Sequence, residues 1–582
     1  MSSQEKQKHI IVIGAGAGGT ACAARLAREG FKVTVVEKND FNGGRCSLIH
    51  HEGYRFDQGP SLYLMPKLFK ETFADLDENI NAHLNLLRCQ NNYKIHFEDG
   101  DKIHLTSDLT KMKPEMERVE GTHGFSRFLD FLNETHEHYE RGTLIAIKRN
   151  FESLWDMIRI QYAPEIFKLH LFDRIYARAS KYFKTKKMRM AFTFQTMYMG
   201  MSPYDAPAVY SLLQYTEFAE GIWYPEGGFN MVIQKLEKIA RDKYGATFRY
   251  ESPVAKINTQ GNQATGVTLE SGEVIEADAV VCNADLVYAY HKLLPPCHWT
   301  QNTLASKKLT SSSISFYWSM DRKVTELDVH NIFLAEAYQE SFDEIFVDNT
   351  LPSEPSFYVN VPSRIDPSAA PADKDSIIVL VPIGHMRGAD AASTPEDYQD
   401  LVNRAREMVL SVLCRRLGLA HFKDWIAHEI VNDPAVWQQK FNLWRGSILG
   451  LSHDVLQVLW FRPSTKDSTG RFDNLFFVGA STHPGTGVPI VLAGSKLTSN
   501  QVCNHFSKTP KPSQLLLKEE EQKIIYKPES GMTPSYWYSV LSLFILVFAF
   551  FVSFPSEQFG HPTAAAYINS CLPAQFRVAV YE

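Results

Sequence analysis

Apolar residues near the amino terminus of this chain form a run that ends in glycines. Residues 10–13 read Ile-Ile-Val-Ile, and Gly14, Gly16 and Gly19 follow. The run predicts a buried strand, and the glycines predict a tight turn into a helix over residues 17–29. The spacing G-x-G-x-x-G is typical of a dinucleotide-binding turn. Its glycines let the backbone approach a pyrophosphate, and the helix directs its free N–H groups at the phosphates.

A second apolar strand, predicted over residues 31–36, ends at Glu37. In dinucleotide-binding units, an acidic side chain at this strand end accepts hydrogen bonds from a ribose 2′-hydroxyl. The same charge disfavours NADP, whose 2′-phosphate would meet a carboxylate. Strand, glycines, helix, strand and carboxylate together predict a Rossmann-type unit, for which NAD and FAD are equally good ligands at this point.

Further along the chain, residues 151–220 are largely helical in pattern and rich in aromatic residues. A basic cluster lies among them, and interleaved cations and aromatics suit a surface on an anionic membrane. A core helix with a solvated basic face is an equally good interpretation. Strand-rich patterns return over residues 247–285 and 310–385, and a helix is predicted over residues 395–417. The basic cluster consists of Arg174, Arg178, Lys181, Lys184, Lys186, Lys187 and Arg189.

Composition narrows the function classes. A chain of 582 residues is too long for a single hydrophobic core, so we expect more than one domain. Its net charge of −6 offers no general attraction to nucleic acid. The eight cysteines contain no C-x-x-C pair, so we expect neither a disulfide framework nor a metal site. Residues 1–8 are polar and contain no apolar signal region, so the binding domain is expected to face the cytosol.

The carboxy-terminal part of the chain contains a long uncharged stretch. Residues 536–554 contain no charged side chain, and a helix of that length just crosses a hydrocarbon core of ~30 Å at ~1.5 Å per residue. Tyr536, Trp537 and Tyr538 would form an interfacial belt at one end. We therefore expect a membrane protein with a single C-terminal transmembrane helix, in the endoplasmic reticulum. A buried core helix is the alternative.

Two further elements resemble those of the amine-oxidase and carotenoid-desaturase superfamily of flavoproteins. Gly43-Gly44-Arg45 resembles a G-G-R element that contacts FAD, and Asp57-Gln58-Gly59-Pro60-Ser61 resembles a loop whose backbone lies near the flavin ring. The region of Val254 resembles the segment that binds adenine through its backbone. The resemblance implies that Gly44, Arg45, Gly59, Pro60, Ser61 and Val254 bind FAD together with Gly14, Gly16, Gly19 and Glu37.

The most specific stretch runs from Asn474 to Gly494. A buried strand meets a glycine-rich turn that opens a helix, whose N-terminus can hold negative charge that develops on a flavin. This stretch resembles the carboxy-terminal signature of the bacterial-type phytoene desaturases, and residues 56–63 and 357–363 are similar to the fungal members of that family. The resemblance covers residues 9–505. It implies FAD contacts at Gly479, His483, Pro484, Gly487 and Val488. An acid/base residue is expected near the flavin ring; the motif does not fix which one, and His483 on this turn is the candidate.

The resemblance implies an FAD enzyme that removes a hydride and a proton from adjacent carbons of phytoene, giving lycopene or a near relative. NAD, a quinone or oxygen would then take the electrons. Its partners would be the apolar polyene and a lipid bilayer, with no nucleic acid, and the oligomeric state stays open. Alternatives are a carotenoid isomerase, a saturase of a polyene alcohol, or a prenyl-binding escort protein of the same fold. The intact flavin elements count against the escort protein.

The expected fold is α/β, with a Rossmann-type FAD-binding domain and an interleaved α+β substrate domain made of an antiparallel sheet and a helical lid, followed by a C-terminal membrane helix. The expected FAD-binding parts are residues 8–90, 226–290 and 466–505; the helical, membrane-facing region is 91–225, the substrate domain 291–465, the linker 506–530 and the tail 531–582.

Overall fold

The computed structural model describes residues 7–151, 165, 168–387, 395–454, 457–458 and 462–515. Within these ranges, no helix has both the length and the apolar character needed to cross a membrane. The predicted membrane-spanning segment, residues 536–554, lies outside the described part of the chain. The elements described below belong to one compact unit, which comprises residues 1–157 and 168–523.

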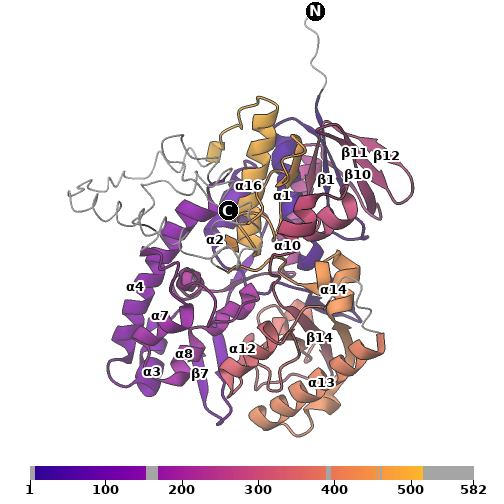
Figure 1. Cartoon of the computed structure of the whole chain (residues 1–582). Coiled ribbons are helices and arrows are strands. Elements are labelled where there is room, and N and C mark those ends of the chain that lie inside the picture. Colours follow the sequence, from indigo (N-terminus) through magenta and orange to yellow (C-terminus); the bar gives the residue numbers. More distant parts are fainter. Residues whose placement is uncertain are drawn as a thin grey trace, which may run out of the picture. The chain divides into compact units, whose positions relative to one another are not determined.

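The predicted amino-terminal strand lies inside a five-stranded parallel sheet of order β19-β13-β1-β2-β9. Strand β1 (His9–Ile13) is central and apolar because both faces of a parallel sheet are covered. Ile10 and Val12 face a core shared with three helices, which pack together in Figure 1: α1 (Ala17–Arg28), α10 (Asn230–Asp242) and α16 (Val488–His505). The other strands are β2 (Lys32–Val36), β9 (Thr247–Arg249), β13 (Ala279–Cys282) and β19 (Leu475–Phe477).

The opposite face of the parallel sheet is covered by a small antiparallel sheet. Ile11 and Ile13 belong to a core shared with strands β10 (Val254–Gln260) and β11 (Gln263–Leu269). Strand β12 (Val274–Glu276) completes this sheet. The alternation along β1 therefore divides its side chains between the helices and the small sheet.

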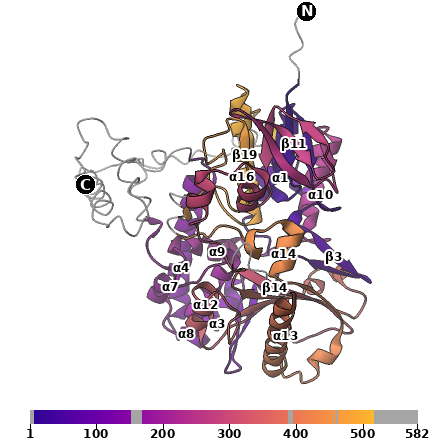
Figure 2. The same cartoon turned by 45° about the vertical axis from the view of Figure 1, so that its right-hand side comes forward.

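A seven-stranded sheet of order β18-β14-β17-β16-β15-β6-β7 forms the second body of the unit. Its neighbours are antiparallel except β6 and β15, so the predicted, mainly antiparallel second sheet is present. Helix α13 (Pro395–Leu417) shares a core with β14 and β17, and lies near β14 in Figure 2. The strands are β6 (Tyr93–His96), β7 (Lys102–Leu105), β14 (Ser312–Met320), β15 (His330–Phe333), β16 (Phe357–Asn360), β17 (Ser376–Ile383) and β18 (Ile426–Asn432).

A helical region with an aromatic core accompanies this sheet, and Phe128, Phe131, Phe183 and Phe192 lie at its centre. Its helices are α3 (Leu109–Glu120), α4 (Gly124–Gly142), α7 (Ile175–Tyr182), α8 (Lys186–Ala191) and α9 (Leu212–Tyr215). The remaining short strands and helices are β3 (Leu48–His51), β4 (Tyr54–Asp57), β5 (Leu86–Arg88), β8 (Trp223–Pro225), α2 (Pro66–Ala74), α11 (Leu286–Tyr288), α12 (Tyr338–Phe346) and α14 (Pro434–Phe441).

Four of the seven cations of the basic cluster, Arg178, Lys181, Lys186 and Lys187, form ion pairs within the fold. Arg178 binds Glu134, and Lys187 lies 2.6 Å from Asp99 and 2.8 Å from Asp101. These ion pairs join α7 and α8 to α4 and to the turn between β6 and β7.

Candidate functional site

The first glycine turn brings α1 close to β1. Gly14 has φ +96°, and its N–H donates to the Val36 carbonyl at 2.8 Å. A Cβ atom at Gly19 would overlap the Gly14 carbonyl oxygen, so only glycine fits this approach. Helix α1 begins at Ala17, directly after the N-cap residue Gly16, and no side chain caps its first turn. Its N–H groups are thereby left to bind an anion such as a pyrophosphate.

Glu37 follows β2 and lies beside the same turn. Its Oε2 accepts a hydrogen bond from the Ala15 N–H at 2.8 Å, and its Oε1 accepts one from the Asn39 N–H at 3.0 Å. Burial raises the pKa of this carboxyl although both bonds oppose the shift. The Glu37 carbonyl accepts from the Ser252 N–H at 2.8 Å, which brings the start of β10 at Val254 to the end of β2.

The element Gly43–Arg45 pairs with the first turn through its backbone. The Gly43 N–H donates to the Ala15 carbonyl at 2.9 Å, and Gly43 forms an isolated parallel bridge with Gly16. A Cβ atom at Gly44 would lie 3.6 Å from the Gly16 Cα. The two glycine elements, predicted separately along the chain, therefore lie side by side.

The predicted loop Gly59-Pro60-Ser61 packs on Arg45. A Cβ atom at Gly59 would lie only 2.5 Å from the Arg45 carbonyl oxygen. The Arg45 guanidinium donates to the Ile448 carbonyl. At the other end of the loop, the Ser61 hydroxyl lies 2.7 Å from the Tyr358 hydroxyl of the seven-stranded sheet. The loop thus connects the nucleotide-binding elements with the second body.

The second glycine turn follows β19 and leads into α16. Gly479 has φ +145° and Gly487 has φ +99°, and Val488 is the first residue of the helix. As in α1, no side chain caps the start of this helix. The two helix starts are neighbours, since a Cβ atom at Gly18 in α1 would lie 2.8 Å from the Val491 side chain in α16.

Asn283, directly after β13, links the two turns, and the sequence reasoning missed it. Its Nδ2 donates to the Val478 carbonyl at 2.7 Å, and its Oδ1 would lie 2.9 Å from a Cβ atom at Gly16. A signal was available, because a polar residue that directly follows a buried parallel strand lies at the edge of the sheet where ligands bind.

His483 ties the second turn to the helical region. Its Nε2 donates to the Arg149 carbonyl at 2.6 Å, and its ring lies 5.1 Å from that of Phe151. Burial lowers the pKa of His483 to about 4, so the imidazole is neutral at pH 7. Pro484 packs against α16, where a Cβ atom at Gly494 would lie 2.9 Å from the Pro484 Cδ.

These elements fit FAD. Uncapped N–H groups at α1 suit its pyrophosphate, and the start of α16 offers a positive dipole end for negative charge on its ring. Glycine backbones at Gly16, Gly43 and Gly44 leave no side chain between the two amino-terminal elements. The arrangement can hold a dinucleotide with one end at the first turn and the other at the second.

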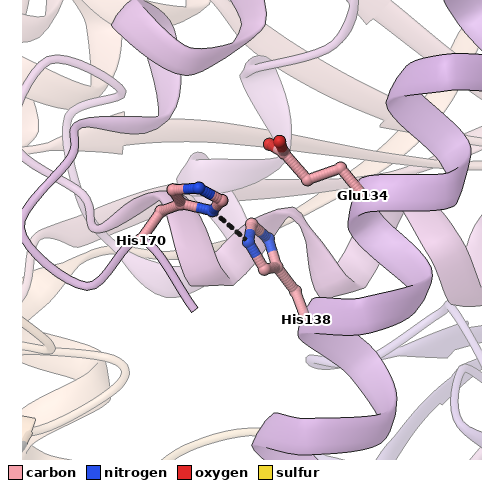
Figure 3. Close-up of side chains that lie close together, drawn as sticks. All are labelled: Glu134, His138 and His170. Atoms are coloured by element: carbon pink, nitrogen blue, oxygen red, sulfur yellow. Dashed lines mark hydrogen bonds between the residues drawn. The ribbon is translucent and has the colours of Figure 1, made fainter. Parts of the chain in front are cut away.

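A separate group, Glu134, His138 and His170, has side-chain atoms close enough to hold a metal ion, within 4.8 Å of one another (Figure 3). His138 Nε2 lies 2.9 Å from His170 Nδ1. Both Glu134 oxygens already accept hydrogen bonds from Arg178, and one also accepts from Tyr182. Because these contacts satisfy the carboxylate and place a guanidinium beside it, the group ties α4 to the segment before α7 without an ion.

Comparisons with known proteins agree with this geometry. Residues 17–503 match the family described as "Flavin containing amine oxidoreductase". The chain is 70% identical to "Phytoene desaturase" of Phycomyces blakesleeanus over 98% of both chains. It is 42% identical to "zeta-carotene-forming phytoene desaturase" of Myxococcus xanthus, over 86% of this chain and 95% of that one. A putrescine oxidase structure bound to putrescine matches 86% of this chain and 99% of its own, with a TM-score of 0.54 and 14% identity, which shows the fold alone.

Proposed function

Because this chain belongs to the flavin containing amine oxidoreductase family, and within it to the phytoene desaturases, we propose that it is an FAD-dependent oxidoreductase that desaturates phytoene in carotenoid biosynthesis. Formation of each new double bond removes a hydride and a proton from adjacent carbons, and successive desaturation steps give lycopene or a near relative. FAD, when bound, supplies the hydride acceptor.

One observation carries the proposal: the uncapped starts of α1 and α16 lie next to each other, with Asn283 between the two glycine turns. Phytoene is a hydrocarbon and offers no handle for nucleophilic or metal catalysis. The chain's own residues therefore act by holding the cofactor and orienting the substrate against it. The Gly59-Pro60-Ser61 loop is suited to this task because it joins the Arg45 element to the second sheet through Tyr358.

The proton released in each step needs an acceptor, for which we retain His483 as the candidate. Its Nε2 donates to the Arg149 carbonyl, so Nδ1 is the nitrogen that remains to accept a proton. The same bond also gives His483 an anchoring role in the turn. The proposed FAD contacts are those that the resemblance implies, with Asn283 added.

The proposal is tested by incubating the purified protein with FAD and phytoene in liposomes, and by separating the products by chromatography. Parallel reactions contain NAD, a quinone or oxygen, each of which is a proposed electron acceptor. We expect phytoene to disappear in at least one reaction while desaturated carotenoids accumulate. Unchanged phytoene in all three reactions, with FAD bound to the protein, would refute the proposed activity.

We also propose that the catalytic unit is held at a membrane, with residues 536–554 as a C-terminal transmembrane helix and the FAD domain in the cytosol. The support is the uncharged stretch itself and the apolar substrate, which dissolves in the bilayer.

A further inference from the structure

Arg462 packs against the second glycine turn and donates hydrogen bonds to that turn and to the neighbouring segment at Ser452 and His453. Its Nε donates to the Thr482 carbonyl at 3.1 Å, and its Nη1 donates to the Ser452 carbonyl at 3.3 Å. Its Nη2 donates to the Ala480 carbonyl and to His453 Nε2, the latter at 3.0 Å. All four acceptors are neutral groups.

His453 extends this network to the far end of the turn. Its Nε2 also accepts from the Thr486 N–H at 3.3 Å, and the Tyr210 hydroxyl donates to its carbonyl at 3.2 Å. Burial, helped by the charge of Arg462, lowers the pKa of His453 well below its usual value, so the ring is neutral. Arg462 and His453 together hold the turn at residues 480, 482 and 486.

The positive charge of Arg462 lies directly against the turn. A Cβ atom at Gly485 would lie 3.8 Å from the Arg462 Cζ and 3.5 Å from the His453 ring, so both side chains pack against the middle of the turn. Burial lowers the pKa of Arg462 to about 10, which leaves it a cation at neutral pH.

This cation lacks an ion-pair partner among the described residues, and Asp454 acts on it from a longer distance. Two buried arginines do have such partners: Arg25 lies 2.9 Å from Asp75, and Arg416 lies 2.5 Å from Glu98. A desolvated charge without a counter-ion is unfavourable unless an anion arrives to balance it.

We propose that Arg462 is a positioning residue whose charge stabilises reduced FAD and whose hydrogen bonds hold the turn against the flavin. The inference rests on the FAD binding of the proposed function. The effect of the charge and the effect of the hydrogen bonds can be measured separately. A lysine keeps the positive charge but cannot form the four hydrogen bonds of the guanidinium.

The experiment measures the dissociation constant of oxidised FAD and the midpoint potential of the holoprotein for wild type, Arg462→Met and Arg462→Lys. We expect Arg462→Met to weaken reduced FAD binding at least tenfold more than oxidised FAD binding, a midpoint about 30 mV lower for a two-electron couple. Arg462→Lys should weaken oxidised FAD binding while the ratio between the two forms stays within about twofold of wild type.

Arg416→Met is the matched control, because Arg416 is also poorly exposed and donates to two backbone carbonyls, those of His96 and Leu334. Its midpoint should equal that of wild type. An unchanged midpoint in folded, FAD-loaded Arg462→Met, or an equal shift in Arg416→Met, overturns the inference. If wild type binds no FAD, the proposed function fails instead.

A wild-type measurement covers the case in which Arg462→Met does not fold. If Arg462 stabilises reduced FAD as an anion, two-electron reduction of the flavin takes up one proton. The midpoint potential should then fall by about 30 mV per pH unit between about pH 6 and 8. A slope of about 60 mV per pH unit means two protons and a neutral reduced flavin, which overturns the inference.

Discussion

Glu217 of the helical region is a buried carboxyl whose protonation makes the stability of the fold depend on pH. Its carboxyl is fully buried, with Oε1 accepting from the Tyr93 hydroxyl at 2.7 Å and Oε2 accepting from the Gln195 amide at 3.1 Å. Neither partner is a cation. Burial raises the pKa of Glu217 to about 8, so the folded protein keeps this carboxyl protonated at neutral pH.

The sign of the pH dependence follows from this shift. The unfolded chain releases the Glu217 proton near its ordinary pKa of about 4.5, whereas the folded chain holds it up to about pH 8. The stability linked to the proton is therefore fully present below about pH 4.5 and is lost as the pH rises through about 8. At about 1.4 kcal/mol per pKa unit, the loss is about 5 kcal/mol in total, and about 2 to 3 kcal/mol of it falls between about pH 5 and 7.

The perturbation is Glu217→Gln, which keeps the shape of the protonated acid. Its amide nitrogen can donate to the Tyr93 oxygen, and its oxygen can accept from Gln195. The variant should match wild type near pH 5 and be more stable by about 2 to 3 kcal/mol near pH 7, because it cannot ionise in the unfolded chain. Since a folded unit of roughly 500 residues unfolds with an entropy of about 1 kcal/mol per degree, the gap in melting temperature should grow by about 2 to 3 °C.

The assay is thermal unfolding of both proteins at the two pH values. Glu134→Gln is the control with the opposite sign, because hydrogen bonds from Arg178 and Tyr182 outweigh the upward effect of burial and lower the pKa of Glu134. Glu134→Gln should be less stable than wild type near pH 7, and the difference in stability should be smaller near pH 5. If the gap between Glu217→Gln and wild type is the same at both pH values, the reasoning about Glu217 is refuted.

Three further predictions concern the cofactor site and the tail. Gly19→Ala should weaken FAD binding more than tenfold in equilibrium dialysis and destabilise the protein by about 1 to 3 kcal/mol, because the new Cβ overlaps the Gly14 carbonyl. The control variant Gly142→Ala should bind FAD like wild type, because its Cβ meets only ordinary contacts in α4. His483→Gln should raise the dissociation constant of FAD and lower kcat about a hundredfold at FAD saturation, as expected for loss of a proton acceptor, and a kcat within tenfold of wild type would leave His483 only its anchoring role. Deleting residues 531–582 should move the protein to the soluble fraction, and complete retention in membranes would contradict a role of the tail as sole anchor.

Local features could be predicted because they depend on neighbouring residues. The apolar run of β1, its glycine turn and the carboxylate at the end of β2 lie within 29 consecutive positions, His9 to Glu37, and turn chemistry and strand periodicity act over such short distances. The same holds for the strand, glycine turn and helix around Gly479 and Gly487. From these local patterns the sequence by itself determined the Rossmann-type unit, and the resemblance added the cofactor and the substrate class.

Only the tertiary structure decided which distant segments meet. Asn283 joins Gly16 to Val478, and Arg462 joins Ser452 to Thr482, although no short spacing in the sequence marks these contacts. The unusual protonation of Glu217 likewise arises from burial among residues far away in the chain. Such contacts depend on how sheets and helices pack, and packing is a property of the whole unit, so no single stretch of sequence encodes it.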